Sequence, residues 1–407
     1  MAFSAAFLLA GYEFIRSPSD SLFKDAYGMD YYIMALAVMP LIVLCFVYGY
    51  SKLLNKYTSE KTLTITNFLS AVAIALCYFI ITADIKEGRI MLFLFREAYI
   101  VLLVEQAWSF INNTINTKQA RLVNGAILAV SSLGAICAAR VISGYAKIFG
   151  TESMLLFSVL TFIPAILCAK LAYKVSLRTS NRDADYYEKQ LEKTKHKKGS
   201  KKDSMGLSLF KKEPILIIIL LVIVSSQIYS TIVSLNYQTN LLESFPNVDD
   251  QTAYSADIYM WLNISSLVLQ LIVVPLVLIA VPLHYIHFFI PAMNLAAISY
   301  VFYNPSLQSS AAAFMLFKTL DYSLFRAAKE ILYIPLSFEA KFRAKEVIDV
   351  FGYRSSKGLS ALSFVLAKKL GTILSTGIFA FIGILASLSW LCFVIPVTRS
   401  SKTGEQN

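Results

Sequence analysis

Charged side chains are scarce in this chain. Only 15% of its 407 residues are Asp, Glu, Lys or Arg, against about 25% in a typical soluble domain. Hydrophobic residues make up 57%, and apolar runs of roughly 20 residues, the length that crosses a bilayer core as a helix, recur along the chain. Because backbone polar groups inside lipid must bond to one another, such runs form helices. The composition therefore predicts an all-α, polytopic membrane protein.

Sequence motifs of enzymes and metal proteins are also missing. The five cysteines include no CxxC pair and lie within apolar runs, where packing is their expected role. No GxxxxGK[ST] motif is present, so the chain shows no sign of ATP hydrolysis. His284 and His287 form an HxxH pair, but no cysteine or acidic ligand lies nearby in the sequence, which favours an interfacial or packing role. We expect no catalytic residues, no metal site and no cofactor.

A polar, basic segment divides the apolar runs six and six. Residues 178–212 contain eleven Lys or Arg against five Asp or Glu, so they supply six of the eleven net positive charges. We predict an N-terminal six-helix half at 1–177, a linker at 178–212, a C-terminal six-helix half at 213–398 and a tail at 399–407. The twelve transmembrane helices are expected at 1–16, 30–51, 63–83, 90–112, 121–146, 151–176, 213–236, 256–281, 283–303, 308–332, 347–367 and 371–397.

The placement of Lys and Arg predicts the orientation in the membrane. Basic residues gather after the second, fourth and tenth spans, in the linker and in the tail, whereas the alternate loops are mostly neutral or acidic. By the positive-inside rule, both termini and the linker face the cytoplasm. The same rule accounts for the basic run at 193–202, so nucleic acid is not an expected partner. Residues 1–10 are read as part of the first span, since no basic region precedes them as in a signal peptide.

Charges inside the spans are the main functional signal, because an Asp, Lys or Arg at a helix centre costs about 2.5–3.5 kcal/mol on insertion. In the fourth span, helical spacing places four polar side chains on one face, with Arg96 beside it. In the tenth span, a second face combines cations with tyrosines, and Glu330 is spaced to pair with Arg326. The two faces consist of Glu97, Glu105, Trp108 and Asn112, and of Tyr322, Arg326, Lys329 and Tyr333.

Two interpretations of these faces remain open. The charges can form intramembrane ion pairs that hold the bundle together, or they can line a polar cavity for an anionic substrate. Cations and aromatic rings on one face suit a phosphate joined to a flat ring, because arginine and lysine bind phosphate and tyrosine or tryptophan stacks on a base.

The segment YSLFRAAKEILYIPLSFEAKFRAKEVIDVFGYRSSKGLSAL at 322–362 resembles the signature of the nucleotide transporter (ATP:ADP antiporter) family of plastids and obligate intracellular bacteria. Weaker matches at 14–23, 95–113 and 236–265 extend the resemblance over nearly the whole chain. The residues of the segment on matching positions are Lys329, Glu330, Ile348, Asp349, Arg354 and Lys357.

The resemblance implies a major-facilitator-like arrangement around a central cavity, with alternating access in a bacterial inner membrane. The implied transport is nucleotide exchange or proton-coupled import, with a nucleotide-type substrate, the lipid bilayer and protons as partners of a monomer. Arg16, Asp20 and Glu97 also match family positions. The expected substrate-binding residues are Arg16, Glu97, Tyr322, Arg326, Lys329, Glu330, Tyr333, Arg354 and Lys357. The expected coupling or ion-pair residues are Asp20, Arg96, Glu105 and Asp349.

Three departures from the family pattern bear on the substrate. Ser19 and Gln238 replace lysines and Ser234 replaces a glutamate, while Lys24 lies where it could take over from the first missing lysine. Because a buried charge needs a partner, we expect a substrate with fewer phosphate charges, or proton-coupled one-way uptake.

Three alternatives stay open. The first is a secondary transporter of a less charged cofactor or nucleoside, and the second is a non-transporting membrane receptor. The third, a lipid flippase, fits the cation and aromatic faces less well. A membrane enzyme is least favoured, because no nucleophile–base pair is apparent.

Overall fold

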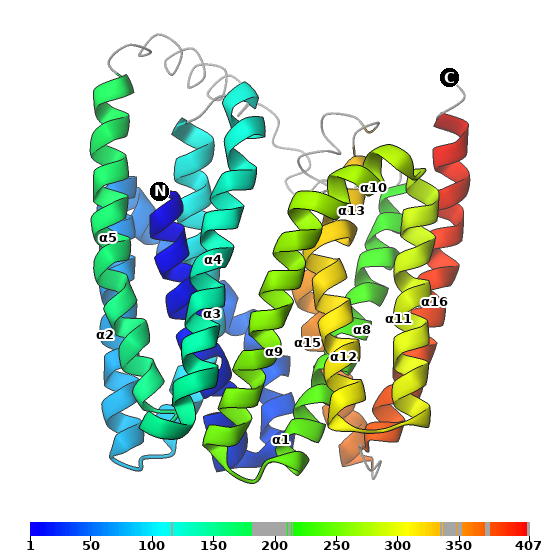
Figure 1. Cartoon of the computed structure of the whole chain (residues 1–407), viewed down its shortest axis with the longest axis horizontal. Helices are drawn as coiled ribbons and strands as arrows, with labels where there is room; N and C mark the ends of the chain where they lie inside the picture. The colour runs from blue at the N-terminus through cyan, green and yellow to red at the C-terminus, as the bar shows by residue number, and fades with distance from the viewer. Residues whose placement is uncertain are drawn as a thin grey trace.

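The computed structural model describes residues 1–114, 117–180, 215–333, 352–370 and 375–404, together with positions 210, 213, 336 and 348. Long helices run side by side through the molecule (Figure 1). In the described part of the chain, eight helical stretches are long and apolar enough to cross a membrane. The chain is a multi-pass helical membrane protein, which confirms the class predicted from composition.

Helix α1 (Ala2–Lys56) contains a break at Gly28. Its 55 residues would measure about 80 Å as a straight helix, against about 30 Å for the hydrocarbon core of a bilayer. Gly28 has φ 76° and ψ 177°, and glycine adopts such a positive φ without a steric penalty. The prediction that the first span ends at residue 16 is wrong, because the helix continues to this break and residues 17–24 are buried.

Four further helices gather around the first part of α1 and lie together on one side of the molecule (Figure 1). Helix α1 packs against α3, α4 and α5, and α2 packs against α3 and α5. A Cβ atom on Gly134 would lie 2.2 Å from the carbonyl oxygen of Ala6, so glycine is what permits the close contact between α4 and α1. The four helices are α2 (Ser59–Thr82), α3 (Glu87–Thr114), α4 (Thr117–Phe149) and α5 (Ser153–Ser180).

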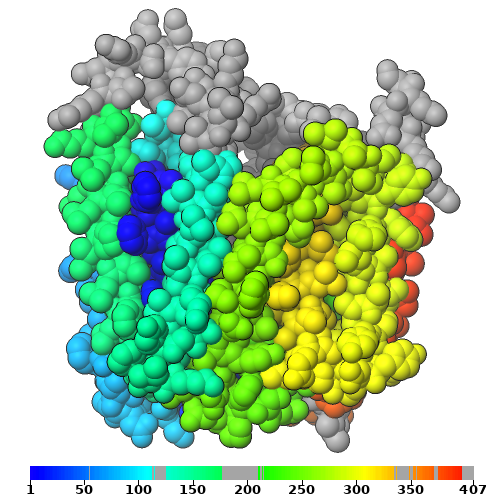
Figure 2. All heavy atoms as spheres, viewed as in Figure 1, coloured from blue at the N-terminus to red at the C-terminus, as the bar shows by residue number. Residues whose placement is uncertain are grey.

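A second group of helices forms the other side of the molecule (Figure 1). Helix α8 packs against α12, α15 and α16, and α11 packs against α12 and α16. The two groups meet where α4 contacts α9 (Figure 2). The second group comprises α8 (Ile215–Ser244), α9 (Val248–Val268), α10 (Val274–Ala280), α11 (Leu283–Tyr303), α12 (Leu307–Leu320), α13 (Arg326–Leu332), α15 (Tyr353–Lys369) and α16 (Thr376–Gly404).

Two π-helical segments interrupt this second group. Segment η1 (Leu269–Val273) joins α9 to α10, and η2 (Asp321–Phe325) joins α12 to α13. The two segments contact each other, and Gln270 Nε2 donates a hydrogen bond of 2.7 Å to the carbonyl oxygen of Tyr322. A π turn holds one extra residue, which rotates the following side chains by about 100° relative to an α-helix. The face expected from Tyr322 to Tyr333 is not uniform. The guanidinium carbon of Arg326 lies 5.8 Å from the centre of the Tyr322 ring, but Arg326 is exposed, whereas Lys329 and Tyr333 are buried.

Polar contacts also join the two groups of helices near the start of α9. The backbone N–H and the hydroxyl of Thr151 both donate to Asp249 Oδ1, at 2.7 and 2.6 Å. Lys147 Nζ lies 2.7 Å from Asp250 Oδ1. The linker predicted at 178–212 and the starts of the spans predicted at 347 and 371 fall largely outside the described residues.

A charged cavity between the two groups of helices

A cavity of about 360 Å³ lies between the two groups of helices. Residues of α1 and α3 line one side, and residues of α8, α9, α12 and α15 line the other. Small-molecule sites in proteins range from about 300 to 1,000 Å³, so the volume fits a small ligand. The charged side chains that line the cavity are Arg16, Asp20, Arg96, Glu97, Lys318 and Lys357.

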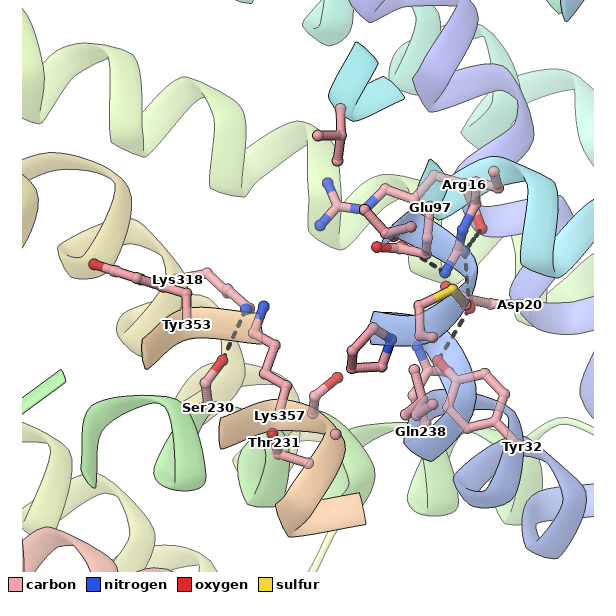
Figure 3. Close-up of a pocket in the computed structure, with 18 of the residues that line it drawn as sticks. Arg16, Asp20, Tyr32, Glu97, Ser230, Thr231, Gln238, Lys318, Tyr353 and Lys357 are labelled. Atoms are coloured by element: carbon pink, nitrogen blue, oxygen red, sulfur yellow. Dashed lines mark hydrogen bonds and ion pairs between the residues drawn. The ribbon is translucent and has the colours of Figure 1, made fainter. Parts of the chain in front are cut away.

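We define the N-terminal wall as Arg16, Asp20, Arg96 and Glu97, and its ion pairs centre on Arg96. Figure 3 labels Arg16, Asp20 and Glu97 on this side of the cavity. Arg96 Nη1 lies 2.8 Å from Asp20 Oδ1, and its Nη2 lies 2.9 Å from Glu97 Oε1. The side chains of Arg96 and Asp20 are each only 4% exposed. A buried pair of this kind is stable only when further hydrogen bonds satisfy both partners.

Further hydrogen bonds are present on both partners, although Arg96 Nε has no acceptor among the described residues. Arg96 Nη1 also donates to Ser19 Oγ at 2.9 Å and to the carbonyl oxygen of Arg16 at 2.8 Å. The hydroxyl of Tyr32 donates to Asp20 Oδ1 at 3.0 Å. Ser19, one of the departures from the family pattern, thus accepts a hydrogen bond from the arginine that holds this wall together.

Arg16 connects the N-terminal wall to α9. Its Nη1 lies 3.2 Å from Glu13 Oε1, an oxygen that also accepts a hydrogen bond of 3.2 Å from Asn263 Nδ2. The guanidinium carbon of Arg16 lies 3.7 Å from the centre of the Tyr259 ring. Arginine over an aromatic face is a favourable cation–π arrangement. This geometry holds the guanidinium of Arg16 against the edge of the cavity.

The C-terminal wall, defined as Lys318 and Lys357, carries cations without matching carboxylates. Lys318 Nζ donates to Ser230 Oγ at 3.0 Å, although the residue is only 7% exposed. The two ammonium groups lie close to each other and point into the cavity (Figure 3). Among the described residues, no carboxylate forms an ion pair with either lysine. Two such cations favour an anion between them.

Lys318 was not among the residues predicted from the sequence. It lies within an apolar run, four residues before Tyr322, which also lines the cavity. Residues four apart share a helical face, so extending the predicted face of the tenth span by one turn would have included it.

Lys24 and Gln238, which the sequence marked separately, form one contact. Lys24 Nζ donates to Gln238 Oε1 at 2.6 Å across 214 residues of chain. Lys24 is buried and does not line the cavity, whereas Gln238 and Ser234 do. Lys24, which could take over from the family lysine missing at Ser19, is therefore hydrogen-bonded to Gln238. Gln238 itself occupies the position of the second missing family lysine.

The remaining predicted residues lie around or outside the cavity. Lys329 is buried, with its Nζ 3.8 Å from Glu330 Oε1 and 5.0 Å from the centre of the Tyr353 ring. Tyr333 is buried outside the cavity lining. Asp349 and the side chain of Arg354 lie outside the described residues. The predicted residues that are exposed and do not line the cavity are Glu105, Arg326 and Glu330.

The fold is that of solved membrane transporters. The inward-open structure of the xylose transporter XylE from E. coli aligns with a TM-score of 0.62 and 12% identity, over 97% of this chain and 95% of that one. The nucleoside transporter NupG aligns with a TM-score of 0.58 and 11% identity, over 96% of this chain and 96% of that one. At such low identity the likeness concerns the fold alone.

The sequence defines the family more narrowly. Residues 90–400 match the family described as TLC ATP/ADP transporter, and the chain belongs to that family. The resemblance carried by residues 322–362 is thereby confirmed. ADP,ATP carrier protein 1 of Chlamydia trachomatis serovar D is 27% identical over 190 residues, which are 41% of this chain and 36% of that carrier. The match thus spans about a third of the length of the curated relative.

Proposed function

We propose that this protein is a secondary transporter that moves a nucleotide, or a related phosphorylated nucleoside, across a membrane by alternating access. The observation that carries the proposal is the pair formed by Lys318 and Lys357, which face the cavity without a carboxylate partner among the described residues. Phosphate oxygens accept strong hydrogen bonds from such cations. Tyr12, Tyr322 and Tyr353 add aromatic rings to the same cavity, on which a base can stack.

The proposed architecture has twelve transmembrane helices in two six-helix halves, at 1–177 and 213–398, joined by the linker at 178–212. The break at Gly28 supports it, because it divides α1 into two pieces that are each long enough to cross a bilayer. The distribution of Lys and Arg supports a linker and termini, including the tail at 399–407, on the cytoplasmic side. We propose a monomer in a bacterial inner membrane.

We further propose a substrate with fewer phosphate groups than ATP. Four cations and two carboxylates line the cavity, but Arg96 is held by Asp20 and Glu97, and Arg16 is held by Glu13. The two lysines of the C-terminal wall are left for the ligand. A single phosphate group carries about −1.5 to −2 charges near pH 7, which two lysines balance.

The test is uptake into proteoliposomes, with a panel of labelled nucleosides and their mono-, di- and triphosphates. Lys318→Ala and Lys357→Ala should each weaken nucleotide binding about tenfold or more, because each removes a charge-assisted hydrogen bond. Lys369→Ala, on an exposed lysine of the same helix as Lys357, is the matched control and should bind as the parent protein does.

The coupling mode follows from the same assay. Nucleotide exchange that persists with an uncoupler indicates antiport, and collapse of net uptake indicates proton coupling. Uptake of nucleosides without any uptake of nucleotides would contradict the proposal. So would unchanged nucleotide affinity in a Lys318→Ala/Lys357→Ala double variant. Binding of ATP as tight as that of a monophosphate would contradict the proposed substrate charge alone.

A further inference from the structure

Gln238 is a buried amide of which one end is bound and the other is not. Only 1% of the residue is exposed, yet it lines the cavity. Its Oε1 accepts a hydrogen bond of 2.6 Å from Lys24 Nζ, and Lys24 is outside the cavity lining. Among the described residues, Gln238 Nε2 has no hydrogen-bond acceptor. Because an unsatisfied buried donor is costly, this N–H group favours an acceptor in the cavity.

Lys24 fixes which end of the amide faces the cavity. An ammonium group has three donors and no acceptor, whereas an amide has both. The end of Gln238 that meets Lys24 is therefore the oxygen, since half a rotation of the amide would place donors against one another. Lys24 lies on α1 and Gln238 on α8. The packing of these two helices thus holds the amide with Nε2 as the group available to a ligand.

The face of α8 around Gln238 is polar but uncharged. Ser234 lies four residues earlier and Thr231 seven residues earlier, spacings that share a helical face, and both line the cavity. Ser234 and Gln238 occupy positions that carry a glutamate and a lysine in the family pattern. This side of the cavity therefore offers hydrogen bonds to a neutral group where the family pattern has charges.

Gln238 is separate from the lysines of the C-terminal wall. Figure 3 places Gln238 toward one side of the cavity and Lys318 and Lys357 toward the other. A ligand that spans the cavity would meet two cations at one end and a neutral donor at the other. A nucleotide has two such ends, a phosphate group and a base with polar groups on its edge.

Apolar side chains of α1 line the cavity as well. A Cβ atom on Gly358 would lie 2.6 Å from Pro40 Cγ, so this apolar face lies directly against the turn of α15 that carries Lys357. A flat ring can pack on such a surface while a few polar groups fix its orientation. The apolar residues, which share one helical face by their spacing, are Leu36, Met39, Pro40 and Val43.

We propose that Gln238 determines the base specificity of the transporter: its Nε2 donates to a carbonyl oxygen on the base, and Lys24 is the positioning residue. A glutamine with both ends available reads adenine with two hydrogen bonds, accepting from the exocyclic amine and donating to a ring nitrogen. Here Lys24 occupies the oxygen, and an amine at this position would meet another donor. The protein should therefore prefer a base with a carbonyl group over one with an amine at the same position.

The inference rests on the proposed function, since the phosphate of the same nucleotide is taken to bind Lys318 and Lys357. The two ends of the cavity make separate contributions. Removal of a lysine should therefore weaken all nucleotides alike, whereas a change at Gln238 should act on one kind of base. The ratio of affinities for two bases separates the two proposals.

The first test compares inosine and adenosine monophosphates, which carry a carbonyl oxygen and an amine at the same ring position. Calorimetry in detergent should show that the parent protein binds inosine monophosphate about tenfold more tightly, the effect of one hydrogen bond and one mismatched donor. Gln238→Leu should bring the two affinities within about twofold, mainly by weakening the inosine nucleotide. Gln227→Leu, on a buried glutamine of the same helix that does not line the cavity, is the matched control and should keep the tenfold preference.

The second test concerns Lys24, which does not touch the ligand. Lys24→Met leaves the amide of Gln238 able to turn, so adenosine monophosphate should bind more tightly than in the parent protein and the preference for inosine should fall to about one. A gain in affinity is a readout that mere loss of structure does not produce. Lys24→Arg, which again offers only donors, should keep the preference.

Two comparisons do not depend on the folding of the Gln238 and Lys24 variants. In the parent protein, the nucleosides inosine and adenosine should bind more weakly than their monophosphates but with the same tenfold ratio. Lys357→Ala should weaken both monophosphates by the same factor and leave their ratio unchanged.

The outcomes distinguish the two proposals. If the parent protein binds the two monophosphates equally, or prefers the adenosine nucleotide, the role of Gln238 is overturned while the proposed function stands. The same holds if Gln238→Leu weakens both nucleotides by one factor, because the amide then contacts the phosphate or the ribose. If the parent protein binds no nucleotide, the proposed function fails and this inference fails with it.

Discussion

The two walls of the cavity use charge in opposite ways. On the N-terminal wall, Arg96 bonds to two carboxylates, a hydroxyl and a backbone carbonyl. On the C-terminal wall, Lys318 bonds to one neutral hydroxyl, and in the described part of the chain neither Lys318 nor Lys357 meets a carboxylate. The first wall is electrically complete, whereas the second retains positive charge.

This difference separates structural charges from charges available to a ligand. A neutralised buried pair adds little net stability, but removing one partner is costly because the other is left buried. A cation without a carboxylate can bind an anion without first breaking another ion pair. An arginine or lysine in a membrane span does not by itself indicate substrate binding. Whether a carboxylate already neutralises that cation is the more informative observation.

The largest expected effect comes from breaking the N-terminal wall. Arg96→Met should lower the free energy of unfolding by about 3–5 kcal/mol, because Asp20 loses its cation while remaining buried. Denaturant titration in mixed micelles, followed by tryptophan fluorescence, measures this. Arg96→Met/Asp20→Asn should recover much of the loss. Lys357→Met on the opposite wall should change the free energy of unfolding little, and equal losses in Arg96→Met and Lys357→Met would refute the contrast between the walls.

An intermediate effect is expected where Lys24 meets Gln238. Gln238→Lys restores a lysine of the family pattern but places a second ammonium group beside that of Lys24. In the parent protein Lys24 Nζ lies 2.6 Å from Gln238 Oε1, the acceptor that this substitution removes. The free energy of unfolding should fall by about 1–3 kcal/mol, because buried donors then lack an acceptor. The measurement is the same denaturant titration.

The exchanged pair is the control for that variant. Lys24→Gln/Gln238→Lys keeps one amide and one ammonium, so stability should return. It also moves the cation to a position that lines the cavity, and the affinity for nucleoside triphosphates should rise. A double variant as unstable as Gln238→Lys would show that the contact does not determine the effect.

The smallest expected effect refines the description of the N-terminal wall. Ser19→Ala removes one of the four groups that accept hydrogen bonds from Arg96 and should cost about 0.5–1.5 kcal/mol of unfolding free energy. Nucleotide affinity should not change. Ser17→Ala is the matched control, since Ser17 is buried two residues away and its hydroxyl has no hydrogen-bond partner in the part of the chain that the structure describes. Equal costs for the two variants would mean that the bond to Arg96 contributes nothing.

Much of the fold could be predicted from hydropathy. The span predicted at 283–303 coincides with α11, because an apolar run bounded by polar residues has one stable conformation in lipid. The end of the first helix could not be predicted in this way. Asp20 and Lys24 read as loop residues, and their burial depends on Arg96 and Gln238, which are distant in sequence. The π turn at Asp321–Phe325 could not be predicted either, because the spacing of apolar residues in the tenth span is compatible with a regular α-helix.

The candidate site was predictable in part. Arg16, Asp20, Arg96, Glu97, Tyr322 and Lys357 were selected from the sequence and line the cavity, although their roles in binding and coupling remain predictions. Arg326 is exposed and does not line the cavity. Lys318, which lines the cavity, was missed because it lies in an apolar run and precedes the motif that begins at Tyr322.

The amino-acid sequence by itself determined that this chain forms membrane helices, that it belongs to a nucleotide transporter family, and that charges are buried within its spans. The reason is that unpaired backbone groups and unpaired charges are both costly in the bilayer. Membrane spans are therefore visible in the sequence as long apolar runs, and the few charges within them stand out. Only the tertiary structure decided which charges neutralise one another. Asp20, Lys24 and Lys318 meet their partners on other helices. The packing of these helices, not the sequence, separates the wall whose charges are paired from the wall whose lysines form no ion pair among the described residues.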